Sequence, residues 1–227
     1  GILLPNIAPD VKWVKPLYDR CYDPLWQVLQ DLEVPINIHS GSGNPDYGPY
    51  PVSMLLYINE VPFYTERPLV QLILSGVFER FPRLKVVLTE AGCAWVPPLL
   101  ERLDTNIRSI RDTGATGEIR YGADHILPKD ATEYFHQNVW MGVSQPRQAD
   151  ADARHIIGLD KFMWGSDYPH DEGTYPYTRE NLRARFSAAP EAEMRKILAG
   201  NAAEMYGFDL DALAPLAARI GPTVEEV

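Results

Sequence analysis

The feature that most constrains the fold is an alternation of short apolar runs with longer stretches of helical periodicity. The runs are rich in β-branched residues, and none alternates cleanly between apolar and polar positions, which is typical of strands covered on both faces. This order predicts an α/β fold of βα units around parallel strands. The predicted strands are GILLP (1–5), VPINIH (34–39), LKVVLTE (84–90), NVWMGV (138–143) and KFMWGSD (161–167).

The helices between these strands have recognisable starts and stops. Asp23 is the expected N-cap of the first helix, with Pro24 at its first helical position. The predicted helices cover 23–33, 65–81, 95–111 and 147–158, with two or three more over 178–208. Two long segments, 40–64 and 167–178, are rich in Gly, Pro and Tyr and are predicted as loops that build a site.

Composition restricts the class of protein. The 227 residues include 45% hydrophobic residues, enough for one domain spanning 1–227. The net charge is −10, and the basic residues are scattered, which argues against nucleic acid or an anionic membrane as partner. Two cysteines without CxxC spacing favour a reducing, cytoplasmic location. No apolar run reaches the roughly 20 residues that a membrane span needs.

Three predicted strands end in a titratable residue: His39, Glu90 and Asp167. The carboxyl ends of parallel strands meet at one edge, so we expect these side chains to face one another. Imidazole and carboxylate suit a divalent cation that activates water, with a carboxylate to move the proton. Taken singly, His39 can be a core histidine, Asp167 can cap its own turn, and Glu90 can pair with an arginine or cap a helix.

The other histidines carry weaker signals. His170 lies three residues past Asp167, in the loop above the predicted site, and is a candidate to support that site or contact substrate. His125, His136 and His155 are assigned structural or surface roles.

The motifs PINIHSGSG, GVFERFPRLKVVLTEAGCAWVPPLLERLD, KFMWGSDYPH and ILAGNAAEMYGF, in this order, resemble the amidohydrolase-related family often called amidohydrolase 2. That family includes relatives of aminocarboxymuconate-semialdehyde decarboxylase, and the resemblance runs from about residue 4 to 208. It implies a (β/α)8 TIM barrel that binds one divalent metal ion, commonly Zn2+, and a small-molecule substrate. It also implies a homo-oligomer.

The resemblance assigns roles by position. His39 matches the family's fifth-strand metal ligand, and Asp167 matches its eighth-strand aspartate, a metal ligand and proton-transfer group. Glu90 stands where the family often has a histidine, and we assign it to metal binding and to orienting water or substrate. The family's first-strand His-x-His or Glu-x-His pair has no match. The chain is therefore expected to hold only the C-terminal five βα units, with about three missing on the amino-terminal side.

Three functions compete. The leading hypothesis is a metal-dependent hydrolase of a small amide, ester or lactone, with Asp167 moving the proton. The alternative is a non-oxidative decarboxylase of an aromatic or unsaturated acid. The second alternative is a catalytically incomplete barrel that serves binding or assembly. A flat substrate would suit the aromatic residues of segment 40–64, which can equally serve packing: Tyr47, Tyr50, Tyr57, Phe63 and Tyr64.

Overall fold

The structure, a computed structural model, describes residues 1–226. All five predicted strands are present. Four are shorter than their apolar runs, and β6 is as long as its run but begins and ends one residue later. The pairs β1–β2, β2–β3 and β6–β7 are parallel. The predicted α/β class with parallel strands is therefore confirmed. The strands are β1 (Ile2–Leu3), β2 (Ile36–His39), β3 (Val86–Thr89), β6 (Val139–Ser144) and β7 (Phe162–Gly165).

The chain divides into two compact units, which we describe separately. Unit 1 comprises Gly1–Ala91 and Trp95–Trp140, and unit 2 comprises Gly92–Ala94 and the residues from Met141 onward. The prediction of a single domain stays a prediction.

Unit 1 contains the three parallel strands β1, β2 and β3. The register places Ile36 beside Val86 and His39 beside Thr89, so β2 and β3 end at the same level. Ile36, Ile38 and Val86 are fully buried, as expected for strands covered on both faces. The helices of the unit are α1 (Asp23–Asp31), α2 (Ser53–Leu74), α3 (Val77–Arg80), α4 (Val96–Thr113) and α5 (Ala131–Asn138), and a hairpin joins β4 (Ala115–Thr116) to β5 (Ile119–Arg120).

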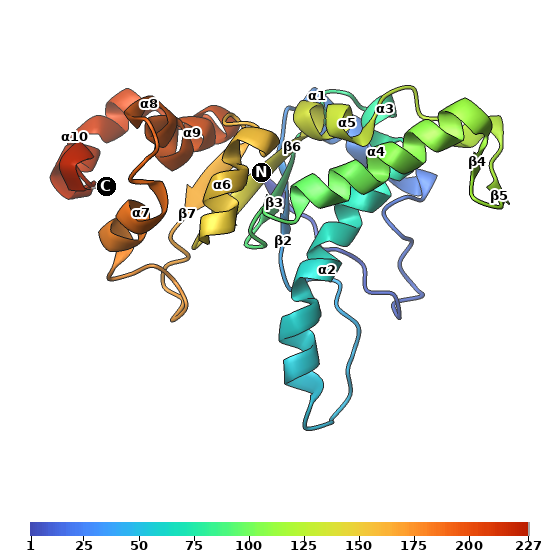
Figure 1. Ribbon diagram of the computed structural model, residues 1–227, viewed down its shortest axis with the longest axis horizontal. Coiled ribbons are helices and arrows are strands. Elements are labelled where there is room, and N and C mark those ends of the chain that lie inside the picture. Colours follow the sequence, from blue (N-terminus) through green and yellow to red (C-terminus); the bar gives the residue numbers. More distant parts are fainter. Residues whose placement is uncertain (227) are drawn as a thin grey trace. The chain divides into compact units, whose positions relative to one another are not determined.

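Helix α2 corrects the sequence prediction. It begins at Ser53 rather than Thr65 and includes half of the segment predicted as a loop. Pro68 lies inside it and cannot donate to the carbonyl of Tyr64 four residues earlier. Asn6 replaces that donor, because its Nδ2 lies 2.7 Å from the Tyr64 oxygen. The N-terminal half of α2 projects away from the rest of the unit (Figure 1).

The C-terminal end of α2 also differs from the prediction. The expected helix over 65–81 is divided in two, because Gly76 adopts φ +69° between α2 and α3. Glycine takes this left-handed conformation without the steric cost that a Cβ brings. At the start of α1, Asp23 is the first helical residue and Tyr22 is the N-cap, one position from the prediction. Pro97 and Pro98 occupy the first turn of α4, where a missing N–H leaves no helical hydrogen bond unmade.

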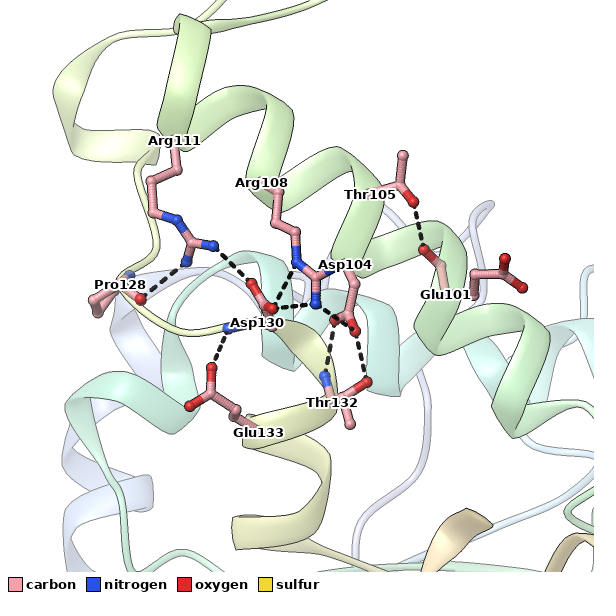
Figure 2. Close-up of polar contacts among 9 residues, drawn as sticks. All are labelled: Glu101, Asp104, Thr105, Arg108, Arg111, Pro128, Asp130, Thr132 and Glu133. Atoms are coloured by element: carbon pink, nitrogen blue, oxygen red, sulfur yellow. Dashed lines mark hydrogen bonds and ion pairs between the residues drawn. The ribbon is translucent and has the colours of Figure 1, made fainter.

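Helices α4 and α5 are joined by carboxylates (Figure 2). Asp130 accepts hydrogen bonds from Arg108 Nε at 2.7 Å and Arg111 Nη2 at 2.8 Å. Asp104 accepts from the backbone N–H of Thr132 at 3.0 Å and from its hydroxyl at 2.7 Å. These bonds satisfy an N–H group at the start of α5 that has no partner within the helix. The hydrogen bond from Arg108 lowers the pKa of Asp130.

Unit 2 is built around the parallel pair β6–β7, with Met141 beside Phe162 and Ser144 beside Gly165. Asn201 ties α9 to the start of β7, because its Nδ2 donates to the carbonyl of Phe162 at 2.7 Å. Helix α6 ends at Ile157, and Gly158 follows it directly. The helices are α6 (Gln148–Ile157), α7 (Thr178–Phe186), α8 (Glu191–Arg195), the π-helix η3 (Lys196–Gly200), α9 (Asn201–Tyr206) and α10 (Leu210–Ile220).

Two smaller expectations concern cysteines and membranes. Cys21 is exposed and Cys93 is buried, and both are free thiols. Burial raises the pKa of the Cys93 thiol. Within residues 1–226, no helix combines the length and the apolar character needed to cross a membrane.

Candidate active site

The ends of β2 and β3 bring together His39, Ser40 and Glu90, which we call the β2–β3 cluster. His39 Nε2 lies 2.7 Å from Glu90 Oε2, and the Ser40 hydroxyl donates to the same oxygen at 3.1 Å. Glu90 adopts φ +64° immediately after β3 ends. A left-handed backbone at a residue with a side chain costs roughly 1–3 kcal/mol and recurs at functional sites. The predicted meeting of His39 and Glu90 is confirmed.

The contacts of the His39 ring indicate a place for a cation. Nδ1 lies 2.7 Å from the backbone oxygen of Ser40, which can only accept. Nε2 faces the Glu90 carboxylate, which also accepts when ionised. A neutral imidazole has one N–H, so if Nδ1–H donates to the carbonyl, Nε2 presents a lone pair toward a carboxylate. Two such electron donors fit a divalent cation, and ligating histidines usually donate their other N–H to a carbonyl or carboxylate.

The ends of β6 and β7 bring together Gln145, Asp167 and His170, which we call the β6–β7 cluster. Gln145 Nε2 donates to Asp167 Oδ2 at 2.6 Å. His170 Nδ1 lies 3.3 Å from the same oxygen, so the prediction that His170 supports Asp167 agrees with this contact. The Asp167 side chain is only 11% exposed, whereas that of His170 is 53% exposed. The cluster therefore centres on a sheltered carboxylate.

Backbone geometry fixes the position of Gln145. Its N–H donates to the carbonyl of Gly165 at 3.1 Å, which continues the β6–β7 ladder by one residue. Gln145 then turns at φ +47°, and Asp167 turns at φ +62° two residues after β7. Gln145 and Asp167 thus both have a left-handed backbone just beyond the ends of adjacent strands, and their side chains meet in a hydrogen bond.

Asp167, His170 and Glu172 each offer a ligand atom, and these atoms lie within 4.8 Å of one another. Carboxylate oxygen with imidazole nitrogen is a donor set for a hard or borderline divalent cation. Both clusters thus fit a metal by their donor chemistry. The expectation that His39, Glu90 and Asp167 bind one ion together stays a prediction.

Sequence reasoning missed Gln145 and Ser40. Gln145 carried one signal, because it is the first polar residue with a long side chain after the run NVWMGVS. A titratable residue at a strand end indicates acid–base or metal chemistry, whereas an amide at the same position does not. Ser40 follows His39 directly, and only the close approach of β2 to β3 makes its hydroxyl a partner of Glu90.

Comparison with known proteins identifies the family. A family model described as amidohydrolase matches residues 1–208. The chain belongs to the amidohydrolase family. The resemblance seen in the sequence is therefore confirmed, over nearly the same residues.

Curated relatives in the amidohydrolase family include two γ-resorcylate decarboxylases. That of Polaromonas sp. is 27% identical over 214 residues, which cover 91% of this chain and 61% of the relative. That of Rhizobium sp. is 24% identical over 220 residues, which cover 92% of this chain and 62% of the relative. The chain thus spans about three fifths of the length of these relatives.

Solved structures agree on the fold. A dihydroxybenzoic acid decarboxylase from Polaromonas sp., with bound manganese and the inhibitor 2-nitroresorcinol, gives a TM-score of 0.64 at 22% identity. The match covers 91% of this chain and 60% of that one. An amidohydrolase from Mycobacterium avium subsp. paratuberculosis gives 0.62 at 27% identity, covering 83% of this chain and 46% of that one. These neighbours are TIM-barrel proteins, so the predicted barrel family is confirmed, here as part of a barrel.

The comparisons also reorder the functional hypotheses. Hydrolysis was the leading hypothesis, but the curated relatives favour decarboxylation, the stated alternative. Zinc, a cytoplasmic location and the homo-oligomer stay predictions.

Proposed function

We propose that this chain belongs to a metal-dependent, non-oxidative decarboxylase of an aromatic or unsaturated carboxylic acid. The observation that carries the proposal is the match to γ-resorcylate decarboxylases over nine tenths of the chain. The donor chemistry of the two clusters supports it, because imidazole and carboxylate fit a divalent cation.

We assign His39 Nε2, Glu90 and Asp167 to metal binding. A bound divalent metal would supply a Lewis acid for the substrate carboxylate and an adjacent oxygen. Manganese is an alternative to the predicted zinc, because a solved relative carries manganese. The Ser40 carbonyl holds His39 through Nδ1, and the Ser40 hydroxyl holds Glu90, so these contacts pre-orient both donors.

We assign the proton to Asp167. Loss of carbon dioxide breaks a C–C bond and leaves the electron pair on the substrate carbon, which must gain a proton. Gln145 and His170 both contact Oδ2 of Asp167, so we assign proton delivery to Oδ1. The low exposure of this carboxylate limits the access of bulk water to it. His170, more exposed, is assigned to orienting Asp167.

The test uses the whole protein that contains this chain, loaded separately with Mn2+ and Zn2+. Carbon dioxide release is measured on a panel of hydroxybenzoates, and hydrolysis on a panel of amides, esters and lactones. We expect release of carbon dioxide from at least one hydroxybenzoate and no hydrolysis. Hydrolysis alone would restore the first hypothesis, and inactivity in both panels with either metal would favour the binding or assembly module.

A further inference from the structure

Asp150 is a carboxylate that belongs to neither cluster and is only 5% exposed. Its Oδ1 accepts hydrogen bonds from the backbone N–H groups of Cys93 at 2.6 Å and Ala94 at 2.9 Å. Its Oδ2 accepts from the N–H of Arg147 at 2.9 Å, where α6 begins. These bonds offset the cost of burying a charged group. All four residues lie in unit 2.

The two N–H groups that contact Oδ1 belong to the segment that joins Glu90 to α4. We call this segment, residues 91–95, the β3–α4 turn. It is irregular, with no helix or strand. Within the turn, the indole N–H of Trp95 donates to the carbonyl of Ala91 at 2.9 Å. Asp150 adds a connection from the turn to a different element, α6, in which it lies.

The contact between Asp150 and the turn is close. Gly92 adopts φ +61°, and a Cβ at this position would lie 2.8 Å from Oδ1 of Asp150. Gly114 has a similar backbone, at φ +68°, but among the described residues nothing lies within 4 Å of a Cβ placed there. Glycine at position 92 is therefore required twice, by its left-handed conformation and by the approach of the carboxylate.

The direction of the Glu90 side chain depends on this turn. The backbone of Glu90 is left-handed at φ +64°, a conformation that contacts in the rest of the structure must stabilise. Gly92 follows two residues later, so a turn that changes its path also changes the direction of the Glu90 carboxylate. In the structure this carboxylate lies 2.7 Å from Nε2 of His39.

We propose that Asp150 is a positioning residue for Glu90. By accepting from the N–H groups of Cys93 and Ala94, it fixes the β3–α4 turn and so keeps the Glu90 carboxylate directed toward His39. The proposal rests on the proposed function in that Glu90 is assigned to metal binding. Loss of the Asp150 contacts should therefore weaken metal binding, although Asp150 itself does not contact the metal.

Two other roles are consistent with the same contacts. Asp150 could stabilise the fold only, as a carboxylate that accepts from N–H groups at the start of a helix. Alternatively, its negative charge could attract the cation whatever the path of the turn. The variants below separate these roles from positioning.

Titration calorimetry with Mn2+ on the whole protein that contains this chain is the first test. Asp150→Ala removes the acceptor of all three N–H groups, and we expect the dissociation constant for Mn2+ to rise about 10-fold. The matched control is Asp104→Ala, because Asp104 is also a buried carboxylate that accepts from an N–H at the start of a helix. Both variants should melt at a lower temperature than the parent, but only Asp150→Ala should lose metal affinity. Equal dissociation constants in the two variants would reduce Asp150 to a structural residue and overturn the proposal.

Asp150→Asn separates hydrogen bonding from charge. The asparagine oxygen still accepts from Cys93 and Ala94, whereas its NH2 group faces the N–H of Arg147, which loses its acceptor. We expect a lower melting temperature but a dissociation constant for Mn2+ near that of the parent. A dissociation constant equal to that of Asp150→Ala would mean that the charge acts on the cation, which would also overturn the proposal.

Gly92→Ala perturbs the same contact from the other side. The added Cβ must displace the turn or the Asp150 carboxylate, so we expect the dissociation constant for Mn2+ to rise about 10-fold. Gly114→Ala is the control, because it adds the same left-handed strain without a close neighbour and should keep the parent affinity. In an Asp150→Ala background, Gly92→Ala should add little further loss, since the two changes act on one contact. Additive losses would contradict the proposed coupling.

One reference variant distinguishes failure of this proposal from failure of the proposed function. His39→Gln removes a metal donor directly. If His39→Gln loses metal affinity but Asp150→Ala keeps it, the metal assignment holds and only the positioning role of Asp150 is wrong. If the parent binds neither Mn2+ nor Zn2+, the metal assignment fails and the positioning proposal fails with it.

Discussion

The β2–β3 and β6–β7 clusters use the same construction for different purposes. In each, an acid with a left-handed backbone lies just beyond a strand, Glu90 at φ +64° and Asp167 at φ +62°. In each, the end of the adjacent strand supplies a partner, His39 or Gln145. Both residues carry a side chain, which disfavours a left-handed backbone, so contacts with the rest of the structure must stabilise this conformation. The shared construction indicates that the fold fixes the direction of both carboxylates.

The two clusters differ in the groups that contact their carboxylates. Glu90 meets an imidazole, and both groups can donate electrons to a cation. Asp167 meets the amide N–H of Gln145 at 2.6 Å, which can only hold the carboxylate in place, and the His170 ring lies farther from the same oxygen, at 3.3 Å. Glu90 is therefore suited to metal binding, whereas Asp167, which we also assign to the metal, is in addition held by an amide that suits it to moving a proton. The predictions below test this division, in order of expected effect.

The largest effect should follow loss of the Asp167 carboxylate. Asp167→Asn keeps the shape of the side chain but removes the proton donor, so we expect kcat for carbon dioxide release to fall about 10²–10⁴-fold. Asp160→Asn is the matched control, because that side chain is 62% exposed in the same unit. Turnover within twofold of the parent would refute the assignment of Asp167.

The next effect should appear in metal affinity rather than in turnover at saturating metal. His39→Gln removes the Nε2 donor, and we expect the dissociation constant for Mn2+ or Zn2+ to rise by at least about 100-fold. Titration calorimetry measures it, with His155→Gln, an exposed helix residue of α6, as control. The division between the clusters fails if His39→Gln leaves metal affinity unchanged.

A smaller effect should follow replacement of Gln145. Gln145→Gly removes the amide that holds Asp167 and also relieves the left-handed backbone at φ +47°. We expect kcat to fall about 10-fold, by analogy with partners that orient site residues, while the melting temperature holds or rises. Gln148→Ala is the control, because the amide of Gln148 is exposed and donates to Asp152 of the same helix. A lower melting temperature with unchanged kcat would make Gln145 a structural residue.

A carboxylate that belongs to neither cluster, Asp104, gives the reference for a purely structural role. Asp104→Ala leaves the N–H and hydroxyl of Thr132 without their acceptor, so the free energy of unfolding should fall by about 1–3 kcal/mol. Metal affinity should not change. Denaturant titration measures the first quantity, and a change in the second would show that the α4–α5 contact also serves the site.

The smallest effect concerns pH. The hydrogen bond from Arg108 lowers the pKa of Asp130 in the folded protein. The stability that ionised Asp130 contributes is therefore present above its unfolded pKa of about 4, and it is lost as the pH falls through the lower folded pKa. Asp130→Asn should therefore show a shallower loss of melting temperature below about pH 4 than the parent. Equal slopes in both proteins would remove Asp130 from the acid response.

Much of the site could be anticipated, because strand ends are visible in the sequence. The apolar runs locate the ends of β2, β3 and β7, and His39, Glu90 and Asp167 follow from them. The residues that orient these groups could not be found in this way. Gln145 and Ser40 gain their roles from the register of adjacent strands, which brings together residues 22 and 50 positions apart.

The sequence by itself determined the parallel α/β class, the family and the candidate acids, because local apolar patterning and motif order are properties of the chain. Only the tertiary structure decided where α2 begins and which of its faces is exposed. Pro62 and the Gly-rich, Pro-rich start of segment 40–64 indicate a loop, yet α2 runs through residues 53–64 and contacts the preceding loop, where the Tyr47 hydroxyl donates to Glu60. Contacts of this kind outweigh local propensity, so residues 53–64 were predicted as a loop and are observed as a helix.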